Sequence, residues 1–274
     1  MTQSTVAALR PYVASLVAYD VTGDAGVHRG LPGTSLTFVL PVEDPIDVGW
    51  VGVSGSRRAG WSSVSGLHPA PAEIHHGERQ RGFFLTLTLE GCRALFGQPA
   101  KELAGQLTDL DEVAPELCPE MTQLPERLHD TESWEERSRI VQRSLVAALA
   151  RNDAPGPRAE VGRALARLTA GAPVAAVADE VGYSRRHLGN LVRAETGLSP
   201  KEWQRVARFE GSRDLVLDAA RAGSPLADAA ARAGYADQAH LAREWRELAG
   251  CPPSQWLREE FPNLQAAGTV APTC

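Results

Sequence analysis

The sequence predicts an α+β protein in which a β-rich N-terminal half precedes an all-helical C-terminal half. Short apolar runs, one of them strictly alternating, lie in the first 90 residues. Amphipathic patterns of helical period fill the chain after residue 159. Between the halves, "RNDAPGPRAE" (Arg151 to Glu160) combines two prolines with a glycine, which is typical of an exposed linker.

A chain of 274 residues, 43% of them hydrophobic, is long enough for two domains of ordinary size. We expect a ligand-sensing or dimerisation domain over residues 1–150, a linker over 151–158, a DNA-binding domain over 159–263 and a flexible tail over 264–274.

Three apolar runs in the N-terminal half have the pattern of strands. In the last of them leucines alternate with threonines, so the leucines, Leu89 included, fall on one face. The runs are "LTFVL" (36–40), "DVGWVGV" (47–53) and "FFLTLTL" (83–89). They predict a small barrel or sandwich of the cupin-like kind.

The pattern of the N-terminal half becomes helical from about Gly97 onward. Ser133 and Glu136 form a capping box at the start of "SWEERSRIVQRSLVAALA". We expect this helix to be either a dimer surface or a cover for the barrel. Its apolar face carries Trp134, Val141, Leu145 and Ala148.

Charge is distributed unevenly along the chain. The whole chain has 28 Lys+Arg against 34 Asp+Glu, a net charge of −6, which argues weakly against a phosphate-binding surface. Residues 1–150 hold 12 basic and 19 acidic side chains, and residues 151–274 hold 16 and 15. The excess acid therefore belongs to the first half, and the second half remains compatible with DNA.

No apolar stretch approaches the length that crosses a bilayer, and the N-terminus lacks a signal-peptide pattern, so we expect a cytoplasmic protein without a membrane partner. Four cysteines are scattered without the spacing of a disulfide framework or metal finger, and we expect them to pack in the fold. They are Cys92, Cys118, Cys251 and Cys274.

Several imidazoles and carboxylates of the N-terminal half could form a metal site in a cupin-like barrel. The spacing argues against it, because adjacent His75 and His76 would point to opposite faces of a strand, and "HHGERQRG" has the composition of a loop. No nucleophile, metalloprotease or phosphate-loop motif is present, so we predict no catalytic residue, no metal and no cofactor. The residues weighed as ligands are His28, His68, His75, His76, Glu73 and Glu78.

The C-terminal half contains one short helical unit twice. "GYSRRHLGNLVRAETGLSPKEW" (182–203) is matched by "GYADQAHLAREWRELAGCPPSQW" (234–256), and an amphipathic helix precedes each copy. Gly182 and Gly234 suit the left-handed end of that helix. Ser184 and Asp237 suit the cap of the next one. Helix, glycine turn and helix make a helix-turn-helix unit, with a helical hairpin repeat as the alternative.

A helical wheel divides the second helix of each copy into an apolar side and a polar side. Leu188, Leu191 and Val192, or Leu241, Trp245 and Leu248, form the buried side. The opposite sides show Arg186, Gly189, Asn190 and Arg193 in the first copy and Ala239, Ala242, Arg243 and Arg246 in the second. Arginine and asparagine match the edges of guanine and adenine, and alanine can contact a thymine methyl.

The region from about Arg158 to Phe261 resembles the DNA-binding domain of the AraC/XylS family of bacterial transcription regulators. The motifs that carry the resemblance are "GYSRRHL", "GLSPKEW", "RVARFEGSRDLVLDA" and "GYADQAHLAREWRELAGCPPSQW". The resemblance implies that the outward residues lie among those that read bases. It also implies that one long helix, from about Pro200 to Ala222, joins the two units. About twenty residues at ~1.5 Å each span roughly 30 Å, close to the ~34 Å of one duplex turn.

We predict nine DNA-binding residues from this arrangement. Gly189, Ala239 and Ala242 offer no long polar side chain where family members often have one, so we expect few direct base contacts from these positions. Arg185, Arg205 and Arg208 could equally hold phosphates or be ordinary surface charges. The predicted residues are Arg185, Arg186, Gly189, Asn190, Arg193, Gln238, Ala239, Arg243 and Arg246.

The segment from Glu73 to Val113 resembles, more weakly, the N-terminal domain of actinobacterial-type AraC-like regulators. This resemblance implies a domain that senses a ligand or dimerises. Aromatic side chains could enclose an apolar molecule there or simply fill a core; they are Trp50, Trp61, Phe83 and Phe84.

The sequence thus predicts a sequence-specific DNA-binding transcription regulator, modulated by a small molecule, that is not an enzyme. Double-stranded DNA is the expected partner, and RNA polymerase, an effector of unknown identity and a second copy of the chain are further candidates. The alternative is a metal-dependent or enzymatic barrel with a DNA-targeting C-terminal domain. A third reading is a DNA binder whose N-terminal half only dimerises.

Overall fold

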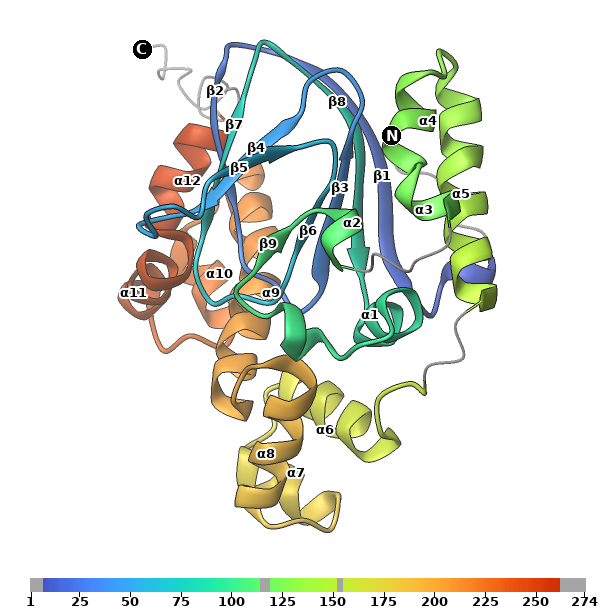
Figure 1. Cartoon of the computed structure of the whole chain (residues 1–274). Coiled ribbons are helices and arrows are strands. Elements are labelled where there is room, and N and C mark those ends of the chain that lie inside the picture. Colours follow the sequence, from blue (N-terminus) through green and yellow to red (C-terminus); the bar gives the residue numbers. More distant parts are fainter. Residues whose placement is uncertain (1–6, 114–118, 152–154, 262–274) are drawn as a thin grey trace, which may run out of the picture.

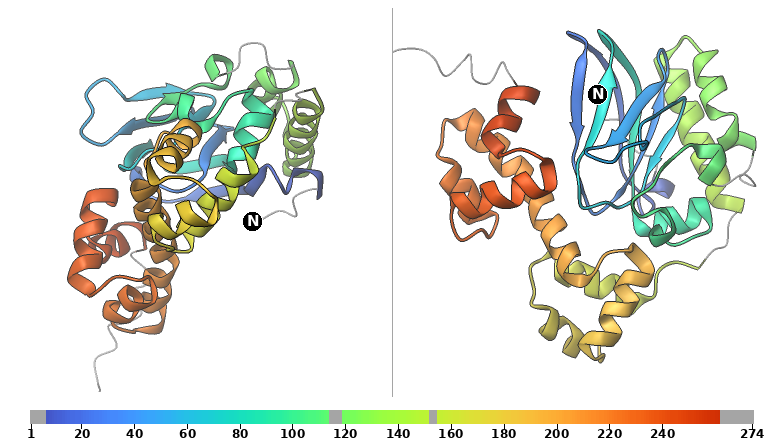
Figure 2. Two further views of the ribbon diagram at one scale, coloured as in Figure 1. Left: turned by 90° about the horizontal axis from the view of Figure 1, so that it is seen from below. Right: turned by 60° about the vertical axis from the view of Figure 1, so that its left-hand side comes forward.

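A computed structural model describes residues 7–113, 119–151 and 155–261. The described N-terminal residues form two antiparallel sheets, with strand orders β1-β8-β3-β6-β9 and β2-β7-β4-β5. The two sheets lie face to face, with helices on the outer side of the larger one (Figure 1 and Figure 2). The strands are β1 (Val13–Thr22), β2 (Gly26–Gly30), β3 (Leu36–Pro41), β4 (Ile46–Trp50), β5 (Arg58–Gly60), β6 (Ser63–Ser65), β7 (Ala72–His76), β8 (Arg79–Leu87) and β9 (Leu107–Thr108).

Helices follow the strands in sequence and then make up the whole C-terminal half. The N-terminal part has η1 (Ala7–Leu9), α1 (Leu89–Phe96), η2 (Ala100–Leu103), α2 (Leu110–Val113), α3 (Pro119–Thr122), α4 (Leu124–His129) and α5 (Trp134–Arg151). The C-terminal part has α6 (Ala159–Thr169), α7 (Val174–Glu180), α8 (Arg185–Thr196), α9 (Pro200–Ala222), α10 (Leu226–Arg232), α11 (Gln238–Ala249) and α12 (Pro253–Glu260). This is the α+β architecture that the sequence predicts.

The two faces of the five-stranded sheet have different surroundings. Phe83 on β8 and Phe38 on β3 are fully buried, and the Phe83 ring lies 5.4 Å from the ring of Trp134 on α5. Their face packs beneath the helices. Phe84 and Val39, one residue further along the same strands, line a cavity between the two sheets instead. The period of two along a strand therefore separates the main core from the cavity.

Helix α5 covers the sheet with the face that its sequence predicts. Val141, Leu145 and Ala148 are buried, and the Ser133 hydroxyl accepts a hydrogen bond from the backbone N–H of Glu136 at 3.3 Å. The cover role is thus confirmed, and the dimer role stays a prediction.

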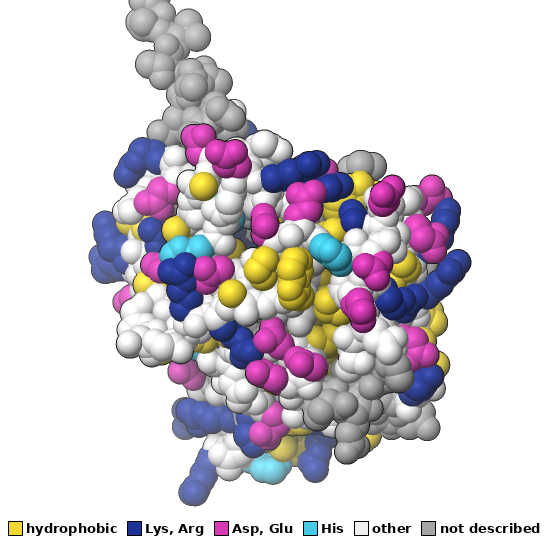
Figure 3. All heavy atoms as spheres, turned by 45° about the horizontal axis from the view of Figure 1, so that its top comes forward, with side chains coloured by type: hydrophobic (Ala, Val, Ile, Leu, Met, Phe, Trp, Pro, Cys, Tyr) yellow, Lys and Arg dark blue, Asp and Glu magenta, His cyan; other side chains and the backbone are white. Residues whose placement is uncertain are grey.

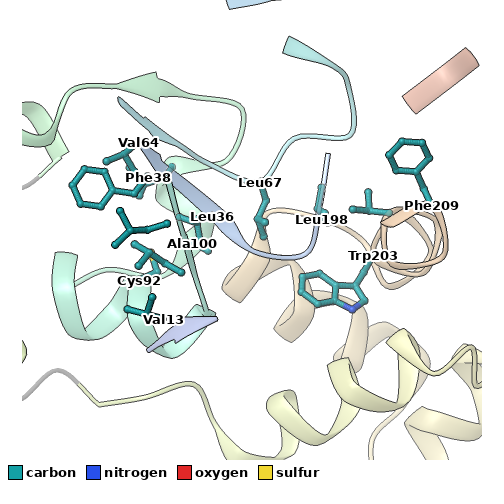
Figure 4. Close-up of a cluster of buried hydrophobic side chains, with 14 of the residues drawn as sticks. Val13, Leu36, Phe38, Val64, Leu67, Cys92, Ala100, Leu198, Trp203 and Phe209 are labelled. Atoms are coloured by element: carbon teal, nitrogen blue, oxygen red, sulfur yellow. The ribbon is translucent and has the colours of Figure 1, made fainter. Parts of the chain in front are cut away.

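The buried apolar side chains of both halves form one continuous cluster. In Figure 4, Leu67 of the β-rich part lies between the group around Phe38 and the side chains of Leu198, which precedes α9, and Trp203 on α9. The helical half is therefore packed against the β-rich half through apolar contacts as well as polar ones.

Three local expectations were wrong. "HHGERQRG" is not a loop but the hairpin of β7 and β8, because His75 and His76 pair with β2 and Arg79 pairs with β1. The last predicted strand ends at Leu87, since the Thr88 hydroxyl accepts a hydrogen bond from Gly91 N–H and caps α1. Helix accordingly begins before Gly97, a left-handed residue (φ 69°) that ends α1.

Helix α5 ends at Arg151 and α6 begins at Ala159. Residues 152–154 of the predicted linker and the predicted tail 264–274 lie outside the described part of the chain. Cys92 and Cys251 are buried and free, and Cys118 and Cys274 lie outside the described residues. No helix in the described ranges is long and apolar enough to cross a membrane.

Acidic and basic side chains are interspersed on the surface at the top of the β-rich part. Figure 3 shows this face, on which charges of both signs surround a group of apolar side chains near the middle. The excess acid of the N-terminal half is therefore not gathered into one patch on this face.

Candidate nucleic-acid interface

The first repeated unit consists of α7, a tight turn and α8. Gly182 lies in the turn with φ 74°, a left-handed conformation that glycine adopts without steric cost. The Ser184 hydroxyl then accepts a hydrogen bond from the backbone N–H of His187 at 3.2 Å, which caps α8. Both local signals act as the sequence predicts.

The second unit repeats this construction with α10 and α11. Gly234 has φ 80°, and the Asp237 carboxylate accepts a hydrogen bond from the backbone N–H of His240 at 2.6 Å. Its negative charge also lies favourably at the positive end of α11. The two units thus have the same helix-turn-helix construction with different N-capping residues.

The predicted DNA-facing side chains lie on the outside of α8 and α11. The side chains of Arg185, Arg186 and Arg243 make no hydrogen bond or ion pair with another residue in the described ranges. The buried faces hold Leu188, Val192, Leu241, Trp245 and Leu248. Of the nine predicted residues, Gly189 is half-buried, while Arg185, Arg186, Asn190, Arg193, Gln238, Ala239, Arg243 and Arg246 are exposed.

One helix joins the two units, with the bounds that the resemblance implies. Helix α9 starts with a complete capping box, in which Ser199 and Glu202 bond each other's backbone N–H, and ends at the left-handed Gly223 (φ 64°). Its 23 residues span about 34 Å at ~1.5 Å per residue. That length is close to one turn of duplex DNA.

Helix α11 is fixed to α9 by a buried carboxylate. Glu244, with a side chain 6% exposed, accepts hydrogen bonds from Arg208 at 2.5 and 3.0 Å and from the Tyr235 hydroxyl at 2.9 Å. Arg205 lies 3.4 Å from the same carboxylate and also pairs with Glu247. Arg205 and Arg208 therefore form ion pairs within the helical domain, with Glu244 as their shared partner.

Burial alone would raise the pKa of Glu244, but the hydrogen bonds and charge of Arg208, with help from Tyr235 and Arg205, lower that pKa below its ordinary value. The carboxylate is consequently ionised when α11 is in place. Trp245 beside it donates its indole N–H to Ser212 of α9 at 2.9 Å, which fixes the same helix pair a second time.

Helix α8 has its buried carboxylate neutralised from the other half of the protein. Arg93 of α1 donates to Glu195 at 2.7, 2.9 and 3.2 Å, and the Glu195 side chain is 6% exposed. No local sequence signal indicates this pair, because 102 positions separate its members.

Further polar contacts join α12 and α9 to strand β2 and the loop after it. Glu260 lies 3.0 Å from Nδ1 of His28 and accepts a hydrogen bond from the Arg29 backbone N–H at 2.9 Å. Glu259 accepts from the Arg29 side chain at 2.9 Å. Glu210 of α9 accepts two hydrogen bonds from Thr34. The helical domain thus presents glutamates to the β-rich domain at several separate points.

The residues weighed as metal ligands take part in other contacts. His28 stacks on His76 with ring centroids 4.1 Å apart, and His68 stacks on Trp50 at the same separation. His75 lies 3.8 Å from Glu73. Within the described residues, no group of three or more His, Cys, Asp or Glu side chains could hold a metal ion.

A cavity of about 560 Å³ lies between the two sheets and extends to α9 and α12. Of the aromatic residues considered for ligand enclosure, Trp50 and Phe84 line it. Phe83 belongs to the core, and Trp61 is 42% exposed and contacts His129. Sequence reasoning missed Trp256 and Phe261, which close the cavity from the helical domain.

Two exposed recognition helices on one long helix define a DNA-binding protein of the helix-turn-helix class. A sequence family described as "Helix-turn-helix domain" matches residues 177–259, and this family is of the AraC type. Residues 177–259 are therefore an AraC-type helix-turn-helix domain, the kind of domain that binds DNA.

Solved structures of ToxT from Vibrio cholerae have a similar fold over almost the whole chain. An apo form has 10% identity and a TM-score of 0.52, covering 93% of this chain and 98% of that one. A second crystal form has 11% identity and a TM-score of 0.51, covering 89% and 97%. ToxT with a bound unsaturated fatty acid has 11% identity and a TM-score of 0.48, covering 93% and 97%. A search of curated proteins found no match.

Proposed function

We propose that this regulator reads two adjacent major-groove faces of one DNA duplex, the first with α8 and the second with α11. The observation that carries the proposal is the pair of exposed, arginine-bearing faces on units joined by the 23 residues of α9. A single short helix contacts few base pairs, and each good bidentate contact discriminates by about 1–3 kcal/mol. A second reader at fixed spacing extends the sequence that is recognised.

Arg186 and Arg243 are the principal base readers in this proposal, because both are exposed and unpaired within the described residues. Asn190 and Arg193 follow. The remaining contacts would come from Arg185, Gly189, Gln238, Ala239 and Arg246.

The test is affinity for a duplex selected from a random library by the full chain. Arg186→Ala and Arg243→Ala should each weaken binding about tenfold or more, as the loss of a bidentate contact implies. Arg163→Ala is the matched control, since Arg163 is an exposed arginine of α6, outside both α8 and α11. Unchanged affinity in the Arg186, Asn190, Arg193 and Arg243 alanine variants would reject the assignment.

A small molecule in the N-terminal domain modulates this DNA binding in our proposal, and the cavity between the sheets supports that role. The domain then serves as a sensor and carries out no catalysis. The exposed side of α5, with Arg139 and Val146, is the surface we propose for a second copy. We place the regulator in the cytoplasm, where DNA and RNA polymerase are its partners.

A further inference from the structure

The cavity between the sheets has walls from both domains. Strands of the β-rich domain form most of it, and Arg213 of α9 with Trp256, Glu260 and Phe261 completes it from the helical side. Its volume of about 560 Å³ lies within the ~300–1,000 Å³ of ordinary small-molecule sites. An occupant of this cavity would therefore contact the sensor domain and the DNA-binding domain at once.

The walls of the cavity are mainly apolar. Val17, Val39 and Phe84 line it from the five-stranded sheet, and Val48 and Ile74 line it from the four-stranded one. The stacked rings of Trp50 and His68 add a flat wall. A molecule that fills this space would gain affinity mostly by removing apolar surface from water.

Each formally charged side chain that lines the cavity already has a partner of opposite charge or a hydrogen-bonded histidine. Arg29 pairs with Glu259 at 2.9 Å, and Arg213 pairs with Glu210 at 3.3 Å. Glu260 lies against His28, whose other ring nitrogen is 3.0 Å from the Gln80 amide. An anionic occupant would meet the Glu260 carboxylate and find no cation of the cavity that lacks a carboxylate partner.

Polar groups that carry no charge are available at one end. Tyr19 and Gln80 line this cavity and also a neighbouring one of about 580 Å³ on the same sheets. Burial raises the pKa of the Tyr19 phenol to about 12, so it is a neutral hydrogen-bonding group at ordinary pH. These groups suit a hydroxyl or carbonyl of the occupant.

The side chain of the helical domain that lines the cavity at α12 also packs against a recognition helix. Trp256 lines the cavity, and its ring lies 5.1 Å from the ring of Trp245. Trp245 is fully buried on the inner face of α11. An occupant that shifts Trp256 therefore acts on the packing of α11, whose outer face carries Arg243.

We infer that the effector proposed above for this cavity is an uncharged, largely apolar molecule of roughly three to four rings or an equivalent chain. The inference rests on the proposed function for its regulatory meaning. The ligand bridges the two sheets and α12, and its occupancy changes DNA affinity through Trp256 and Trp245.

The test compares two ten-carbon probes, 1-decanol with an uncharged hydroxyl head group and decanoate with an anionic carboxylate, as competitors of the neutral dye Nile red on the full chain at pH 7.5. Decanol should compete at least about tenfold more strongly than decanoate. Equal or stronger competition by decanoate would overturn the ligand class. Because the titration contains no DNA, its outcome is independent of the DNA-reading proposal.

Two variants locate the site. Phe84→Ala removes an exposed part of the cavity wall and should weaken Nile red binding about fivefold or more. Trp61→Ala is the matched control, an exposed aromatic outside the cavity, and should bind as the wild type does. Equal affinity of the Phe84→Ala variant and the wild type would overturn the site.

Coupling is measured as the affinity for the selected duplex with and without saturating decanol. We expect a shift of at least about threefold in the wild type and a smaller one in the Phe84→Ala variant at the same decanol concentration. An unchanged affinity in the wild type would overturn the coupling through Trp256.

Discussion

Arg93 of the β-rich domain forms a forked ion pair with Glu195 of the first recognition helix, at 2.7 to 3.2 Å. The buried carboxylate of the second recognition helix, Glu244, stands at a different position of the repeat and is neutralised inside the helical domain by Arg208 and Arg205. The two recognition helices are therefore held differently. Helix α8 depends on the N-terminal domain for its counter-charge, whereas α11 depends on α9.

Removing Arg93 should destabilise the whole chain. Arg93→Ala leaves the Glu195 carboxylate buried without its cation, and we expect the free energy of unfolding to fall by about 2–4 kcal/mol. Urea denaturation measures the loss. The double variant Arg93→Ala/Glu195→Leu should recover most of it, because the unpaired charge is gone. A single variant as stable as the wild type would show that the pair contributes nothing.

The two helix caps should each contribute measurably to stability. Ser184→Ala and Asp237→Ala remove the acceptors of the His187 and His240 N–H groups, and each should lower the free energy of unfolding by about 1 kcal/mol. Ser254→Ala, at an exposed position within α12, is the control and should change little. Equal stability of all three variants would contradict the capping role.

Acid should weaken the attachment of α11 through Glu244. The folded-state pKa of Glu244 lies below its ordinary value of 4.5, so the stabilisation is present above about pH 4.5 and is lost as pH falls through the folded pKa. The free energy of unfolding of the wild type should therefore decline below pH 4.5 more steeply than that of Glu244→Gln. Glu247→Gln, at an exposed position, should retain the wild-type slope. Parallel profiles for Glu244→Gln and the wild type would argue against this role.

The helical half could be predicted from the sequence because short-range signals determine its turns, caps and helix bounds. The glycine turns, the caps at Ser184 and Asp237 and the bounds of α9 depend on residues a few positions apart, and the structure has them where they are predicted. The β-rich half depends on pairing between distant segments. Its hairpin at Gly77 was missed because "HHGERQRG" is polar, although partners in β2 and β1 extend it.

The contacts between the domains were likewise invisible in the sequence. The pairs of Arg93 with Glu195 and of His28 with Glu260 join residues 102 and 232 positions apart. The cavity could be anticipated only as a group of aromatic residues, of which Trp50 and Phe84 line it while Phe83 and Trp61 do not. One residue of register in a strand decides between core and cavity, and a single sequence does not determine that register.

The base preference at each position of the selected DNA is the measurement that tests the central claim most directly. The wild type should select two short motifs whose centres lie about 10 base pairs apart, one for each recognition helix. Arg186→Ala should lose sequence preference in one motif only, and Arg243→Ala in the other only. A single undivided motif, or the same positions lost in both variants, would contradict the claim that α8 and α11 read neighbouring grooves from the two units that α9 joins.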